Sequence, residues 1–181
     1  MDTLVRELES LGELAKTTSP QEIFAKAVKT IASFLAKRFA VTEAEIALLL
    51  LRPNRQVLRF AHPLEHFKGQ TNVFPVNSPG VATNVVRSGR GMIHNDMSRV
   101  SRLDIYEWIS TGGAKPREIQ KMIAAPLTLS GGEVIGVVEV SRKGKSLDEA
   151  GSNFTPGELA ELTQIGAAVA PWIQRLTPPD F

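Results

Sequence analysis

The sequence predicts one α/β domain in which helices pack against a mostly antiparallel sheet. Three observations support this fold class. The chain has 181 residues, which is the length of one domain, and 43% of them are hydrophobic. Amphipathic helical segments lie near both ends, and short apolar or alternating segments bounded by turn residues lie between them. Because a chain of this length buries about 70% of its unfolded surface, the core needs no covalent staple.

Two helices are predicted at the N-terminus. In segment 1–18 the apolar residues recur at spacings of four, three and four, at Leu4, Leu8, Leu11 and Ala15. Such a seam pairs with another helix, so we interpret this N-terminal helix as a possible dimerisation seam. The second helix begins after Ser19, whose side chain can cap it, with Pro20 at the first helical position and Glu22 three residues after the cap. Its apolar face is expected to lie against the sheet.

Three strands are predicted next. The apolar run Ile46–Leu51 is suited to a central strand, and Gln56–Ala61 is its hairpin partner across a turn. Asn72–Val76 is the third strand. Because Pro75 cannot donate a backbone hydrogen bond, this strand should lie at an edge or contain a bulge.

The middle of the chain begins with a short helix, Val81–Arg87, followed by Gly89, which tolerates the left-handed conformation after a helix. Met92-Ile93 is a short strand. Residues 95–121 are the least regular part of the sequence, and we expect a short helix around Leu103–Ser110.

The clearest hairpin joins Met122–Leu129 to Glu133–Ser141 through a turn that contains two glycines. A polar loop, 142–153, follows. Thr155 then caps the last helix and Glu158 completes the capping pattern. The apolar seam of this helix is Leu162, Gly166, Val169, Ile173 and Leu176. Residues 19–176 should form the domain, and 177–181 a C-terminal tail.

Composition excludes several functions. There is no cysteine, which rules out disulfides, thiolate metal sites and thiol catalysis. The net charge is only +2, so no nucleic-acid partner is expected. The longest apolar run, Ile46–Leu51, is too short to cross a bilayer, and the N-terminus lacks the pattern of a secretion signal, so we expect a cytoplasmic protein with no membrane partner.

Four stretches, in one order and spacing, resemble the GAF domain family over about Ser19 to Ile173. They are Gly80–Gly89, similar to the family's Gly-x-x-x-x-V-x-x-S/T-G helix; Ile93–Asp96, its strand and Asn-Asp corner; Met122–Leu127, its strand ending in Pro-Leu; and Val134–Val140 with Phe154-Thr155. The resemblance implies a central, mostly antiparallel sheet with the first and last helices behind it. A short helix and an irregular lid would close a pocket in front. It also implies frequent dimerisation through terminal helices.

The family's known activities fit this chain poorly. Members that attach a bilin use a cysteine, and members that reduce free methionine sulfoxide use several, whereas this chain has none. Cyclic-nucleotide-binding members carry an Asn-Lys-Phe-Asp-Glu signature. The matching positions here are Arg142-Lys143 and Gly157-Glu158-Leu159, where only Lys143 is retained, which puts binding of cGMP or cAMP in doubt.

Eight residues are the candidate ligand-binding set: His94, Asn95, Asp96, Tyr106, Trp108, Met122, Ala124 and Glu139. The polar group at 94–96 offers donors, acceptors and a titratable ring, although Asx residues at strand ends often bond their own backbone. The aromatic pair would form a lid, or the buried face of a small helix. Glu139 lies in an apolar strand, either buried with partners or turned to water. Met122 and Ala124 belong to the pocket floor or the core.

No nucleophile motif, phosphate loop or paired carboxylates are visible, so we predict no enzyme and no metal; the cofactor is unknown. The leading hypothesis is a regulatory domain that binds an unidentified small molecule between sheet and lid and signals through its terminal helices, as a homodimer. The alternative is a ligand-free module for protein interaction or dimerisation.

Overall fold

A computed structural model describes residues 1–15, 17–63, 73–100 and 118–181. Within these ranges the helices are α1 (Asp2–Leu14), α2 (Pro20–Arg38), α3 (Val81–Ser88) and α4 (Pro156–Leu176), with short 3-10 helices η1 (Glu43–Glu45) and η3 (Met97–Arg99). The strands are β1 (Ile46–Leu51), β2 (Val57–His62), β3 (Val73–Pro75), β4 (Met92–His94), β5 (Glu118–Thr128) and β6 (Val134–Gly144).

The strands form one six-stranded sheet in the order β3-β2-β1-β6-β5-β4. Every neighbouring pair is antiparallel. The predicted α+β class is therefore confirmed, and β3, which contains Pro75, lies at an edge as expected. The predicted short helix at Leu103–Ser110 lies outside the described residues.

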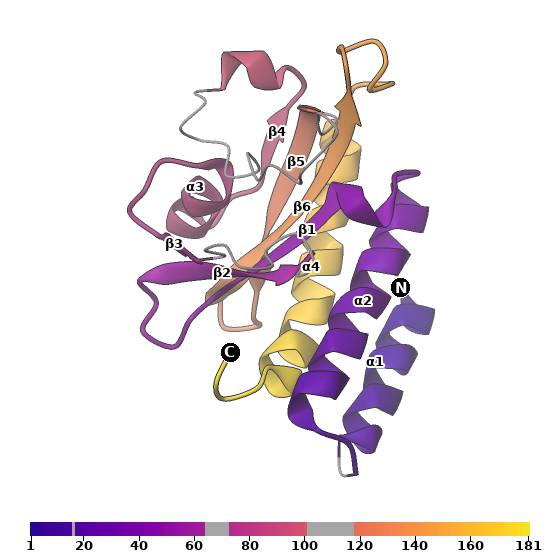
Figure 1. The fold of residues 1–181 in the computed structure, drawn as a ribbon, viewed down its shortest axis with the longest axis vertical. Coiled ribbons are helices and arrows are strands. Elements are labelled where there is room, and N and C mark those ends of the chain that lie inside the picture. Colours follow the sequence, from indigo (N-terminus) through magenta and orange to yellow (C-terminus); the bar gives the residue numbers. More distant parts are fainter. Residues whose placement is uncertain (16, 64–72, 101–117) are drawn as a thin grey trace, which may run out of the picture.

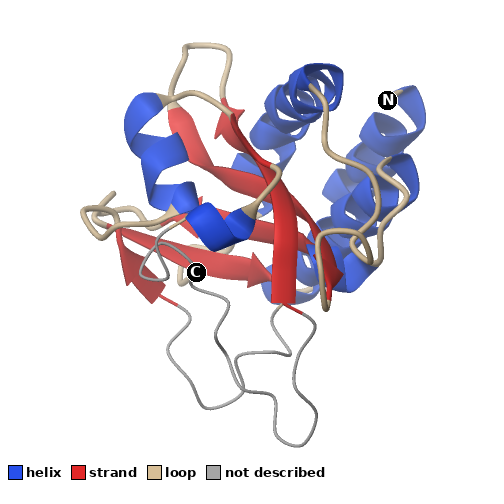
Figure 2. Cartoon of the chain, turned by 90° about the horizontal axis from the view of Figure 1, so that it is seen from above, coloured by secondary structure: helices blue, strands red, loops and turns tan. Residues whose placement is uncertain are grey.

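Helices cover the two faces of the sheet unequally. Figure 1 shows α1, α2 and α4 on one side, which we call the back face, and α3 on the other, the front face. Figure 2 gives the same arrangement from above, with the sheet between the two groups of helices. α4 packs on β5 and α2 on β1, while α1 lies against α2 and α4.

Local signals place the long helices where the sequence predicts them. The side chain of Ser19 accepts a hydrogen bond from the Glu22 amide at the start of α2, and Thr155 and Glu158 form a complete capping box at the start of α4. The structure adds η1, which the sequence analysis did not predict, although Thr42 and Glu45 form a capping box of the same kind.

Two strands are longer than predicted. β5 begins at Glu118 rather than at residue 122, and β6 continues to Gly144, into the predicted polar loop. Glu118 pairs with Gly144, and the Gln120 side chain donates to the Gly144 carbonyl at 3.0 Å. These ends are polar, so the apolar pattern does not reveal them; hydrogen bonding between the two strands extends the hairpin.

The predicted helix seams are buried within the chain itself. Leu4 and Leu8 of α1 and Ile173 of α4 belong to the back-face core, as do the apolar faces of α2, β1, β5 and β6. Gly166 lets α4 approach the sheet, because a Cβ there would lie 2.8 Å from the carbonyl oxygen of Pro126. The segment predicted as a tail also joins this core: the Phe181 ring is 9% exposed and meets the Phe24 ring edge-on at a centroid distance of 5.0 Å.

Candidate functional site

A cleft of about 630 Å³ opens on the front face beside the edge strand β4. Its walls are the end of β4 and the residues after it, the first turn of α3, η3, and the loop that precedes α4. Volumes of this size are typical of small-molecule sites. Its polar lining residues are Asn84, His94, Asn95, Asp96, Arg99 and Asn153.

α3 forms one wall of the cleft, and a buried side-chain hydroxyl in its first turn fixes where the helix begins. The buried Thr83 hydroxyl donates to the carbonyl oxygens of Ser78, at 2.8 Å, and Gly80, at 3.0 Å. At the other end, Gly89 adopts the left-handed conformation with φ of 64°, as the sequence predicts. These two ends place Val81 and Asn84 toward the cleft.

Asn95 lies in the cleft wall, but both polar atoms of its side chain form hydrogen bonds within the protein. Its Nδ2 donates to the carbonyl oxygen of Phe154 at 3.0 Å, and its Oδ1 accepts from the Phe154 amide at 2.8 Å. The amide therefore imitates a peptide group and joins two segments 59 residues apart. This is not the local backbone bonding that was the alternative at this position.

Asp96 does bond locally, as Asx residues at strand ends commonly do. Its Oδ1 accepts from the Ser98 amide at 3.1 Å, and its Oδ2 lies 2.9 Å from Nε of Arg99. Hydrogen bonding from the Ser98 hydroxyl, with smaller contributions from the Ser98 amide and the positive charge of Arg99, lowers the pKa of Asp96 below its ordinary 3.8; partial burial opposes the shift. Asp96 thus carries its negative charge into the cleft over a wide pH range.

Glu139 lies on the front face and is only 6% exposed, which settles the question of its burial. In the sheet it is paired with Ala47 of β1 on one side and Ala124 of β5 on the other. Opposed residues in an antiparallel pair point to the same face, so the carboxylate stands between two methyl groups.

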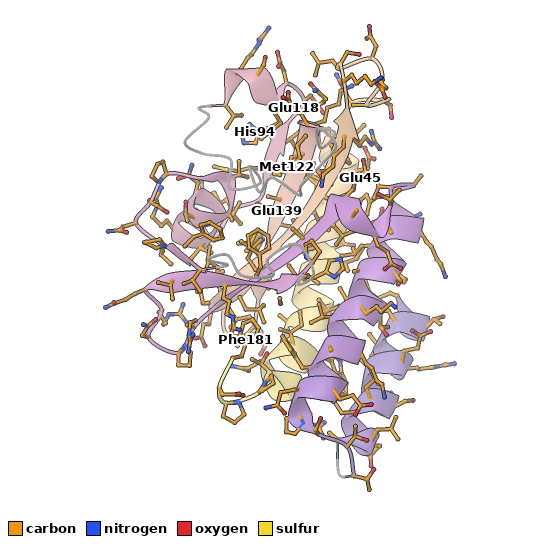
Figure 3. The ribbon with its side chains drawn as sticks, viewed as in Figure 1. Glu45, His94, Glu118, Met122, Glu139 and Phe181 are labelled. Carbon is orange, nitrogen blue, oxygen red and sulfur yellow. The ribbon has the colours of Figure 1, made fainter. Side chains whose placement is uncertain are left out.

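Strand β4 connects the cleft to the part of the sheet where Glu139 lies, because β4 pairs with β5 and β5 pairs with β6. Met92 pairs with Ala124, and His94 pairs with Met122. Figure 3 shows His94, Met122 and Glu139 following one another along this part of the sheet. Of the eight predicted residues, His94, Asn95 and Asp96 line the cleft. Met122 and Ala124 belong to the buried apolar cluster of the front face, and Glu139 is buried beside Ala124; these three are not among the residues that line the cleft. Tyr106 and Trp108 lie outside the described residues.

Three polar residues of the cleft lining, Asn84, Arg99 and Asn153, were not in the predicted set. Arg99 follows Asp96 at the spacing of one helical turn, and Asn84 follows Val81 in the same way, so both carried a weak local signal. Asn153 lies three residues before α4 and had no local sequence signal. Its place in the cleft depends on how the loop before α4 packs against β4.

A metal site finds no support in the part of the chain that the structure describes, where no three histidine or acidic side chains gather as ligands. His62 is nearly buried, and its Nε2 lies 3.2 Å from the carbonyl oxygen of Glu43. His66 lies outside the described residues.

The sheet, the unequal helical layers and the front-face cleft define an α+β domain with one open side. The chain belongs to the GAF domain family, whose profile matches residues 17–174. This is a regulatory and sensor domain family found in signalling proteins. The predicted resemblance is therefore confirmed.

Solved structures with the same fold include regulatory and catalytic proteins. The GAF domain of a phosphoenolpyruvate-protein phosphotransferase from Acinetobacter is 13% identical with a TM-score of 0.58, and the match covers 95% of this chain and 91% of that one. A type II free methionine-R-sulfoxide reductase from Thermoplasma acidophilum is 14% identical with a TM-score of 0.60, covering 88% and 98%. Residues 122 to 287 of a methyl-accepting chemotaxis protein are 14% identical with a TM-score of 0.61, covering 92% and 95%. At these identities the likeness concerns the fold alone.

A comparison with curated proteins finds no match. Among the described residues, no helix has both the length and the apolar character needed to span a membrane.

Proposed function

We propose that this chain is a non-catalytic GAF-type regulatory domain that binds a small polar molecule in the front-face cleft and signals through its terminal helices. One observation carries the proposal. Side chains from β4, α3, η3 and the loop before α4 converge on one concave space, and a buried carboxylate, Glu139, lies on the same face of the sheet, two strands from β4. Concave sites with a few convergent polar groups are the usual form of ligand pockets.

The lining favours a ligand with both donors and acceptors. Asp96 offers a carboxylate oxygen, Arg99 a guanidinium, and Asn84 and Asn153 amides. Because Arg99 is held to Asp96 through Nε, its terminal nitrogens face outward as a planar fork. A small molecule with mixed polar groups matches this lining better than an apolar one does.

The absence of cysteine supports a non-catalytic role. The resemblance to the family implies that members which reduce free methionine sulfoxide use several cysteines. This chain has none. This chain is thus similar in fold to the reductase from Thermoplasma acidophilum, but it lacks the cysteines that the resemblance assigns to that reaction.

Native mass spectrometry of the purified chain, compared with its mass after denaturation, tests the proposal. We expect a retained small molecule in the native protein. Glu139→Gln and Asp96→Asn should reduce its occupancy, whereas Glu133→Gln, which changes an exposed carboxylate paired with Arg55, should not. If nothing is retained, and no compound in a metabolite panel raises the melting temperature, the ligand-free interaction module is the better description.

Homodimerisation stays a prediction. Since the seams of α1 and α4 are buried in their own chain, a dimer would have to use the outer surfaces of these helices, where Met1 and Leu14 are exposed large apolar residues. Analytical ultracentrifugation over a range of concentrations would measure the oligomeric state directly.

A further inference from the structure

The double hydrogen bond between Asn95 and Phe154 joins the cleft to the start of α4. Asn95 follows directly on β4 and lines the cleft. Phe154 immediately precedes Thr155, the N-cap residue of α4. A displacement of the cleft wall at Asn95 therefore acts on the backbone one residue before the N-cap of the helix.

The loop before α4 also lines the cleft directly, through Asn153. Asn153 lines the cleft, and the next residue, Phe154, is held by Asn95. The cleft is thus bounded on two sides by residues that meet at Phe154. Any molecule bound between them would contact both, and it would favour one spacing of β4 and this loop over others.

The first turn of α4 depends on the position of this loop. The Thr155 hydroxyl accepts from the Glu158 amide at 3.2 Å, and Glu158 accepts from the Thr155 amide at 2.8 Å. Substituting such caps typically destabilises the start of a helix. Because Thr155 follows Phe154 directly, movement of Phe154 changes the geometry on which both bonds depend.

Charge in the cleft lies next to this connection. Asp96 is the neighbour of Asn95 in sequence, and its carboxylate holds both the Ser98 amide and the Arg99 guanidinium. A ligand that binds Arg99 would compete with Asp96 and loosen this turn. Because Asn95 and Asp96 share a peptide bond, a movement of the Asp96 turn would displace the backbone of Asn95 as well.

We propose that Asn95 couples the state of the cleft to the stability of the first turns of α4, through its paired hydrogen bonds to Phe154. The role of this coupling in signalling rests on the proposed function, but the coupling itself can be measured without a ligand. α4 packs on β5 and contacts α1 and α2, so its first turn is a point from which a local change reaches the back layer.

Amide hydrogen exchange in α4 tests the coupling. Asp96→Asn breaks the charge pair with Arg99 while keeping the size of the side chain. We expect it to change exchange of the first amides that donate hydrogen bonds within α4, residues 159–165, by about two- to tenfold, the range of a modest coupling energy. In a chain that also carries Asn95→Ala, the same Asp96 substitution should have no effect on these amides.

A matched control comes from another asparagine amide. The Asn54 Oδ1 accepts from the Gln56 amide in the β1–β2 turn, far from the cleft. Asn54→Ala removes one side-chain hydrogen bond as well, and the Asp96 effect on α4 should persist in that background. If Asn95→Ala does not fold, Asn95→Asp, which keeps the acceptor and loses the donor, should weaken the effect without abolishing it.

Two results would overturn the proposal: an Asp96 effect on α4 of equal size with and without the Asn95 amide, or no effect in either background. The outcome is separable from that of the ligand experiment. Retained ligand without coupling refutes this inference alone, whereas coupling without any retained ligand refutes the proposed function and leaves the connection standing.

Discussion

The two faces of the sheet differ in composition and in what covers them. On the back face, β1 contributes Leu48 and Leu50, β5 contributes Ile123, and these side chains are buried under α2 and α4. On the front face, the same strands contribute Ala47 and Ala124 beside the buried Glu139. Among the described residues, one short helix and η3 cover this side.

The difference teaches how the two faces of one small sheet can divide between packing and a polar cleft. The larger of the two buried apolar clusters lies on the back face, and burial stabilises a fold by about 25 cal/mol per Å² of apolar surface removed from water. The front face has a smaller cluster, which includes Leu49, Phe60 and Met122, and it also holds a buried carboxylate and the polar cleft. The predictions below test this division, beginning with the largest expected effect.

Adjacent residues of β5 offer the most direct comparison. Ile123 points to the back face and Met122 to the front face, and both are nearly inaccessible to solvent. We expect Ile123→Ala to lower the free energy of unfolding by about 4 kcal/mol and Met122→Ala by about 2 kcal/mol, because a site beside a cleft relaxes more readily than a filled core. Urea denaturation would measure both. Equal losses would mean that the front face is as tightly packed as the back.

The C-terminus extends the back-face core. The Phe181 ring contacts Phe24, and the Arg59 guanidinium lies 4.6 Å from its centroid. Phe181→Ala should destabilise the protein by about 3 kcal/mol, the lower end for a buried phenylalanine, because Phe181 lies at the rim of the core and keeps 9% exposure. Phe181→Leu keeps the apolar contact and should cost about 1 kcal/mol by losing the ring interactions. A melting temperature that is unchanged in both variants would show that these residues behave as a free tail.

Substitutions at two glycines of α4 distinguish the effect of packing on stability from the effect of helix propensity. A methyl group at Gly166 would meet the Pro126 carbonyl, whereas at Gly157 the nearest atom is 3.8 Å away. We expect Gly166→Ala to destabilise by about 2 kcal/mol through overpacking, and Gly157→Ala to be neutral or to stabilise by up to about 1 kcal/mol. Thermal unfolding of the two variants would measure this contrast. It would be refuted if both substitutions raised the melting temperature.

The cleft should contribute least to stability, and with a defined pH dependence. The pKa of Asp96 is lowered in the folded protein, so below the ordinary value of 3.8 the unfolded state binds a proton that the folded state does not. Stability from this group is therefore complete above that pH and is lost as the pH falls toward the lowered folded pKa. Asp96→Asn should remove this part of the acid dependence, and urea denaturation at several pH values below about 5 would detect it. Parallel curves for the two proteins would contradict the assignment.

Much of the fold could be predicted because its signals are local. The caps at Ser19 and Thr155, the left-handed Gly89 and the edge proline Pro75 each act within a few residues of their own position. The alternation of faces along a strand likewise follows from the chain alone, and it placed Met122 on the same face as Ala124. The ends of β5 and β6 could not be predicted in this way, because polar residues there are held by the partner strand.

The site was only partly predictable. Asp96 behaves as its local sequence indicates, by accepting from the Ser98 amide two residues on. Asn95, one residue earlier, has the same kind of side chain and an entirely different partner, Phe154. No local pattern distinguishes these two residues, since the difference arises from a loop that comes 59 residues later.

By itself the sequence determined the elements, their order, the family and the absence of thiol chemistry, because periodicity, caps and composition are properties of short segments. Tertiary structure decided which groups meet. It buried Glu139 between two alanines, brought Asn153 to the cleft and seated Phe181 on the core. These contacts join segments distant in sequence, and they form only when the packing of the whole sheet fixes where each segment returns.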